Sequence, residues 1–252
     1  MPRKLIPGLV LMLWAVHLTA VVTEDSASSN ALSGITLLSS SVSDFTLSPT
    51  IPATGVALSG HWPFGMADCA VYGLQTAQAL GPLIANCGAN FLTTQDYRLQ
   101  NYQLGLALHY QDLSLGATGF LHYENFAGLA SYHEWSSNLA LSYRGAEYGT
   151  EIKLVHLGQP DSELHLTASN CIIPGVTAAS TYVYSRQQED SYRFASSYEL
   201  VDLLLLQVSW QSAPARFGAG LNLCIGSTEL MYAVRSHPEL RLSHSLDLAF
   251  RW

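Results

Sequence analysis

The sequence has few charged residues and, beyond its first residues, no long hydrophobic run. Charged residues make up 12% of the 252 residues, while hydrophobic residues make up 48%. Ordinary soluble domains carry roughly 25% charged residues. After residue 22, no stretch approaches the roughly 18 consecutive apolar residues of a membrane-spanning helix. The chain is too poor in charge for a typical soluble protein, yet it has no helical spans that would absorb its apolar residues.

Basic residues and cysteines are also scarce. The formal net charge is −8, and Arg98 is the one basic residue between residues 23 and 143. This acidic balance argues against nucleic acid as a partner. No two of the four cysteines have metal-ligand spacing, so the sequence predicts no metal site.

The first 22 residues have the three parts of a secretory signal. Arg3 and Lys4 precede an uncharged run that ends at Val22, and polar residues follow. This order predicts a signal peptide over residues 1–22 and therefore an exported protein. An uncleaved anchor is the alternative, because the run reaches the lower length limit of a spanning helix.

Alternating runs begin near residue 55 and continue to the end of the chain. In the clearest run, 102–110, Tyr and Leu alternate with smaller or more polar residues such as Gln103 and Ala107. Successive side chains of a strand point to opposite faces, so we expect Leu and Tyr to meet lipid and the other set to face a lumen. The predicted strands are 55–62, 69–79, 83–91, 101–110, 113–122, 136–144, 147–156, 162–171, 176–184, 190–198, 200–210, 215–224, 227–235 and 241–252.

The spacing of these runs fits membrane-spanning strands. Each run and its turn take about 14 residues, which matches a strand of about 9–11 residues and a short connection. The apolar positions follow a period of two, which excludes a helical interpretation. The sequence therefore predicts an all-β fold, a transmembrane antiparallel up-and-down β-barrel of 12–14 strands over residues 55–252. A soluble secreted β-protein is the alternative, although its outward face would need charge where this chain has Leu and Tyr.

The last strand carries the membrane signature of the chain. Phe250 and Trp252 end its apolar face, as expected of a closing strand whose end sits in an interfacial aromatic belt. Asp247 and Arg251 lie on its other face. Residues 23–54 lack this alternation and are rich in serine, so they form either a plug inside the barrel or a flexible linker.

Four charged residues are predicted to face the lumen: Glu151, Lys153, Asp247 and Arg251. They could line a polar path, but a structural interior in which opposite charges pair or meet water is the favoured interpretation. Small residues are also predicted to point inward, leaving room for a channel or an inserted segment: Gly105, Ala107, Gly116, Gly218 and Gly220.

No motif with a catalytic mechanism is present. Histidines near carboxylates, at 122–124, 133–134 and 237–239, have no recognised ligand spacing, and we expect those in loop positions to be solvated polar groups. Serine is so abundant that no Ser–His pair stands out. The sequence therefore predicts no catalytic residue, no enzyme and no cofactor.

The segment 232–252 contains a Tyr-bearing strand, a Ser-His-Pro-Glu-Leu turn and Ser-His before the closing strand. This ending resembles that of the PorV/PorQ-type outer-membrane proteins, a group related to long-chain fatty-acid transporter barrels. The resemblance implies a barrel of about fourteen strands in the outer membrane of a Gram-negative-type cell. It makes His237, Pro238 and Glu239 a tight structural turn. Near residues 47–50, only the proline of the family's Asn-Pro-Ala signature is matched.

Two functions follow from this resemblance and from the predicted barrel. The first is a structural or secretion-associated membrane component, since some relatives are accessory parts of the type IX secretion system. The second is a transporter or channel for small hydrophobic molecules. Expected partners are outer-membrane lipid, the barrel-assembly machinery and secretion-system proteins.

Overall fold

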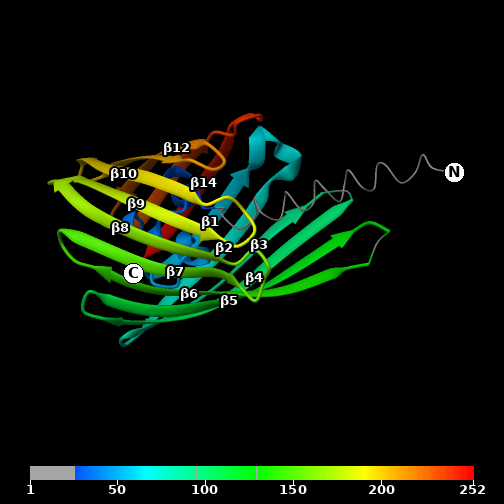
Figure 1. Cartoon of the computed structure of the whole chain (residues 1–252), viewed down its shortest axis with the longest axis horizontal. Coiled ribbons are helices and arrows are strands. Elements are labelled where there is room, and N and C mark those ends of the chain that lie inside the picture. The colour runs from blue at the N-terminus through cyan, green and yellow to red at the C-terminus, as the bar shows by residue number, and fades with distance from the viewer. Residues whose placement is uncertain (1–25, 95, 129) are drawn as a thin grey trace.

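The computed structural model describes residues 26–94, 96–128 and 130–252. Its main body is a closed barrel in which each strand pairs antiparallel with its sequence neighbours and β1 pairs with β14 (Figure 1). The strands are β1 Gly55–Trp62, β2 Val71–Leu80, β3 Leu83–Thr93, β4 Tyr97–Tyr110, β5 Leu113–Phe126, β6 Tyr132–Arg144, β7 Tyr148–Leu157, β8 Glu163–Ile173, β9 Val176–Ser185, β10 Ser191–Val201, β11 Leu204–Gln211, β12 Arg216–Ile225, β13 Thr228–Arg235 and β14 Ser243–Arg251. The predicted membrane β-barrel is confirmed, at the upper end of the predicted strand count. The predicted signal peptide, 1–22, lies outside the described residues.

The two faces of the barrel follow the alternation of the sequence. On β4, the side chain of Leu104 is 72% exposed, whereas Gln103 and Ala107 are buried. On β14, Phe250 is exposed and Asp247 is buried. The outer surface is therefore apolar and the interior is polar, as a bilayer requires. Among the described helices, none is long and apolar enough to cross a membrane.

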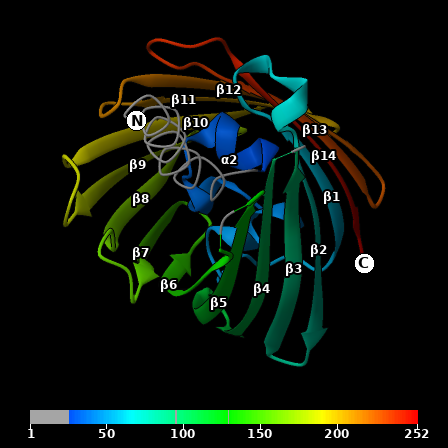
Figure 2. The same ribbon diagram turned by 90° about the vertical axis from the view of Figure 1, so that its right-hand side faces the viewer.

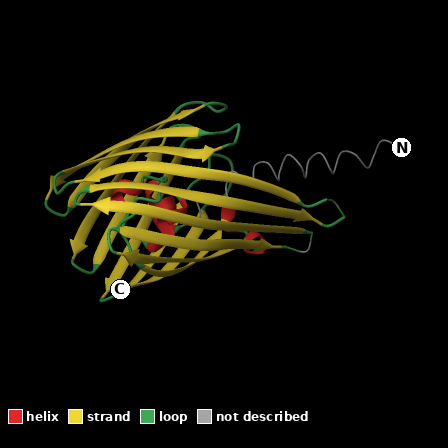
Figure 3. Cartoon of the chain, turned by 90° about the horizontal axis from the view of Figure 1, so that it is seen from below, coloured by secondary structure: helices red, strands yellow, loops and turns green. Residues whose placement is uncertain are grey.

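The two ends of the barrel differ in the length of their connections. At one end the strands are joined by turns of two or three residues, and at the other by loops of up to eight residues (Figure 3). Exposed aromatic side chains lie near both ends, with Tyr110, Tyr148 and Trp252 at the short-turn end and Tyr72 and Trp135 near the long-loop end. Such paired aromatic belts mark the two water–lipid interfaces of a membrane barrel.

Strands β4, β5 and β6 are longer than predicted at the long-loop end. The pairing of β5 with β6 continues to Glu124 and Tyr132, so His122 and His133 belong to strands. His122, the last residue of the predicted strand 113–122, does lie in a strand, whereas the expectation that the histidine at 133–134 lies in a loop was wrong. Backbone hydrogen bonds continue the ladder there even though the side-chain alternation has become irregular.

We expect Leu104→Arg to destabilise the barrel by about 2–4 kcal/mol, because a charged side chain near the bilayer midplane must leave water. Leu104 lies in the middle of β4 and faces outward. Urea unfolding in lipid vesicles would measure the loss. Leu240→Arg, in the exposed loop before β14, is the matched control and should change the free energy of unfolding little. Equal losses in both variants would contradict the lipid-facing position of Leu104.

Candidate functional site

Residues 26–54, here called the lumen segment, lie inside the barrel (Figure 2). Their secondary structure consists of the helix α2 (Ala27–Leu32) and the 3-10 turns η1 (Thr36–Leu38) and η2 (Val42–Thr46). Within the lumen segment, only Ser40 and Pro52 are exposed. Sequence analysis left a plug and a flexible linker open, and burial inside the lumen favours the plug.

The sequence limits α2 at both ends. The side chain of Ser26 accepts a hydrogen bond from the backbone N–H of Ser29 at 2.9 Å, which caps the first turn. Ser33 and Gly34 both have positive φ, 51° and 76°, and this left-handed backbone ends the helix. Ser33 also places its hydroxyl oxygen 2.8 Å from that of Ser209 on β11. Short polar side chains therefore let the segment turn sharply and still bond to the wall.

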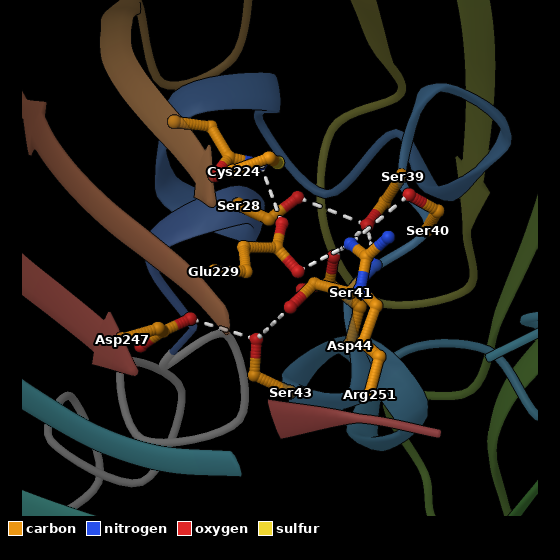
Figure 4. A network of polar contacts seen from close by, with 11 residues as sticks. Ser28, Ser39, Ser40, Ser41, Ser43, Asp44, Cys224, Glu229, Asp247 and Arg251 are labelled. Carbon is orange, nitrogen blue, oxygen red and sulfur yellow. Dashed lines mark hydrogen bonds and ion pairs between the residues drawn. The ribbon is translucent and has the colours of Figure 1, made fainter. Parts of the chain in front are cut away.

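Asp247 joins the lumen segment to β14. Its Oδ2 accepts a hydrogen bond from the hydroxyl of Ser43 at 2.7 Å (Figure 4). The same oxygen accepts from the backbone N–H of Ala27 at 2.8 Å. On η2, the Asp44 carboxylate accepts from Ser26 and Ser39. A buried carboxylate needs such donors to offset its lost hydration. The lumen-facing position expected for Asp247 therefore serves to hold the segment.

Glu151 on β7 is a second attachment point. Its carboxylate accepts hydrogen bonds from the hydroxyls of Thr36 at 2.5 Å, Ser48 at 2.7 Å and Thr50 at 3.1 Å. The Glu151 side chain is 1% exposed. One wall carboxylate thus binds two stretches of the lumen segment that are more than ten residues apart.

Arg144, at the end of β6, binds the backbone of the same segment. Its Nη1 donates to the carbonyl oxygens of Leu37 at 2.9 Å and Ser39 at 3.3 Å, and its Nη2 donates to that of Thr36 at 3.0 Å. Sequence analysis placed Arg144 at the end of the predicted strand 136–144 and missed this role. Strand parity could have found it, because Leu141 and Tyr143 point outward and the next residue must point inward.

The other two charged residues singled out in the sequence have different surroundings. Lys153 on β7 is buried and faces a cavity described below. Arg251 forms an ion pair with Glu229 of β13 and donates to the hydroxyl of Ser40 at 3.3 Å (Figure 4). Sequence analysis missed Glu229. It lies two residues from Met231 on the same strand, so its side chain points to the same face, toward the lumen.

The stretch His237-Pro238-Glu239 does not form a tight hairpin. It lies within a seven-residue loop, 236–242, that joins β13 to β14 at the long-loop end. There, the ring of His237 packs edge-on against Phe64, with centroids 5.2 Å apart. The predicted tight turn was wrong, because contact with the β1–β2 loop holds a wider connection that turn residues alone do not reveal.

A cavity of about 160 Å³, here called the vestibule, lies at the long-loop end of the lumen. Thr46 and Leu47 of the lumen segment line it, together with residues from eleven strands, β3 to β13, and several long loops. Its basic residues are Lys153, Arg193, Arg216 and Arg235. The lumen segment therefore lies between this polar mouth and the short-turn end.

Acidic groups of the vestibule lie beside histidines on and near β8. Glu163 Oε2 lies 2.7 Å from His165 Nε2, and Asp161 Oδ2 lies 3.6 Å from His156 Nδ1. In the loop before β8, the nearby His156 ring lowers the pKa of Asp161 below its usual range. The described residues contain no cluster of His, Cys, Asp and Glu that could hold a metal ion.

Comparisons with known proteins bear on the fold alone. No protein-family model matches the sequence, and no curated protein matches it. Among solved structures, the CymD monoaromatic hydrocarbon channel has a TM-score of 0.62 at 11% identity, covering 90% of this chain and 97% of that chain. The KdgM porin and a mutant of Rh. blastica porin have TM-scores of 0.46 and 0.47 at 5% identity, each covering 79% of this chain and 99% of the other. The chain is thus a fourteen-stranded membrane β-barrel with the overall fold of a known channel.

Proposed function

We propose that the protein is an outer-membrane channel closed by its own lumen segment, without catalytic activity. The observation that carries the proposal is the position of the segment, which fills the lumen below an accessible polar vestibule. The segment is held at Asp247, Glu151 and Arg144 by individual hydrogen bonds. Hydrogen bonds to charged groups such as these contribute about 1.5–3 kcal/mol each. In the proposed open state the segment is displaced, and water in the lumen hydrates the charged groups that it leaves.

The shape of the barrel supports an outer-membrane location. Outer-membrane barrels have short periplasmic turns and longer external loops. By this rule the short-turn end, with both Gly55 and the C-terminal Trp252, would face the periplasm. The vestibule would then open to the outside. Outer-membrane lipid and the barrel-assembly machinery remain the partners that this location implies.

Planar-bilayer recordings test the proposal. The chain without residues 23–54 should conduct steadily, whereas the intact protein should be closed for most of the recording, because its lumen is occupied. Heat-modifiable gel migration would show that both proteins contain a folded barrel. Silence from both folded, inserted proteins would contradict the channel proposal.

The second candidate is a secretion-associated scaffold. The observation that favours it is the resemblance of 232–252 to the ending of PorV/PorQ-type proteins, together with a lumen occupied by the chain itself. A scaffold would bind a protein partner at its long loops and would stay silent in bilayers after the deletion. The same recordings therefore separate the two candidates.

A channel for hydrophobic molecules is less favoured for this chain, although CymD is a monoaromatic hydrocarbon channel. The vestibule contains four basic residues, and apolar solutes would gain little binding free energy from them. Its lining suits a polar or charged solute.

A further inference from the structure

Three arginines occupy one wall of the vestibule because of the strand register. Arg193 on β10 pairs with Gln211 on β11, and Gln211 pairs with Arg216 on β12. Directly paired residues of neighbouring strands point to the same face and lie about 5 Å apart. Arg235 follows on β13, opposite Gly218, two residues beyond Arg216. Four consecutive strands thus present three guanidinium groups to one cavity.

Hydrogen bonds position this wall. Arg235 Nη2 donates to Gln211 Oε1 at 2.8 Å, and Gln211 Nε2 donates to the carbonyl oxygen of Ala213 at 2.9 Å. Arg193 Nη1 donates to the carbonyl oxygen of Ser33 in the lumen segment at 3.0 Å. Arg193 and Arg235 are each 6% exposed. Arg235 is therefore held against Gln211, and Arg193 is held against the lumen segment.

The charge of this wall contrasts with that of the whole chain. The protein has 11 basic residues and a net charge of −8, yet Lys153 and the three arginines all line the vestibule. Its acidic residues are Asp161 and Glu163, which lie beside histidines, and the exposed Glu189 in the loop before β10. The arginine wall is thus a concentrated positive region within an acidic protein.

We propose that the vestibule binds an organic anion carrying carboxylate or phosphate groups, with Arg193, Arg216 and Arg235 as its ligands. The planar guanidinium matches both groups in bidentate geometry. It has five N–H donors, so one arginine can serve a protein oxygen and an anion together. Partial burial strengthens such contacts relative to those in water. The inference rests on the proposed channel function, which makes the bound anion the solute.

Calorimetric titration of the intact protein in detergent tests the site without requiring conduction. The probes are citrate, inorganic phosphate and, as a neutral control, a sugar alcohol of similar size to citrate. We expect citrate or phosphate to bind and the sugar alcohol not to bind. Arg216→Gln should weaken anion binding about tenfold or more, since it removes a charged hydrogen-bonding partner. Arg216→Lys keeps the positive charge but not the planar guanidinium group, so it should cause an intermediate loss of anion affinity.

Arg186→Gln is the matched control, because Arg186 is exposed at the same end of the barrel and does not line the vestibule. It should leave binding unchanged, and gel migration would confirm that each variant contains a folded barrel. Absence of anion binding, binding of the sugar alcohol equal to that of citrate, or equal losses in the variants at 186 and 216 would overturn the site. Anion binding to a protein that never conducts would support the anion site and contradict the proposed channel function. Conduction without anion binding would support the channel function and contradict the anion site.

Discussion

The open probability of the Gly218→Leu variant is expected to be about 5- to 150-fold higher than that of the unsubstituted protein. Gly218 lies on β12 and faces α2, and a Cβ there would overlap the carbonyl oxygen of Asn30 and lie 2.9 Å from that of Ala31. These are backbone atoms, so the helix itself must shift. Overpacking of this kind destabilises the closed state by about 1–3 kcal/mol. This free energy corresponds to an increase of about 5- to 150-fold in the population of the displaced segment. Open probability in planar bilayers is the measurement.

The control for this variant is Gly119→Leu on β5. Gly119 points outward, and the nearest atom to a Cβ there is the carbonyl oxygen of Leu104, 4.0 Å away. The substitution adds the same side chain without touching the lumen segment, so its recordings should match those of the original protein. Unchanged closure in a folded Gly218→Leu barrel would argue against the proposed displacement of α2.

Glu151→Leu is expected to lower the free energy of unfolding by about 3–5 kcal/mol, because removing one side of a buried charged network leaves the other side unpaired. The variant removes the common acceptor of the Thr36, Ser48 and Thr50 hydroxyls. It also removes a carboxylate that offsets the positive charge of Arg144. Urea unfolding in vesicles would measure the loss, and limited proteolysis would show whether the lumen segment becomes accessible.

Glu151→Gln is the paired control, since its amide keeps one acceptor oxygen of similar shape. We expect it to lose less than half as much stability as Glu151→Leu. If the leucine variant were as stable as the original protein and equally resistant to protease, Glu151 could not be a main attachment point of the segment.

The faces of the strands were predictable from the sequence, but the partners of the inward residues were not. Alternation alone indicated that Glu151 and Asp247 face a lumen, because side-chain direction along a strand is a local property. Alternation also places Arg144 and Glu229 on the inward face. Both were missed because they lie close to turns, where the alternating pattern is hard to recognise. Asp44 could not be predicted, since residues 23–54 show no periodicity.

By itself, the sequence determined the barrel class, the lipid-facing and lumen-facing sets, and the approximate positions of the turns. These features depend on covalent geometry and on neighbours within a few residues. The tertiary structure decided the occupied lumen and the arginine wall. Closure of β1 onto β14 encloses the lumen in which Ser43 meets Asp247, and the register of β10 to β13 gathers Arg193, Arg216 and Arg235. Such contacts join residues far apart in the chain, so they exist only once the strands have paired around the segment.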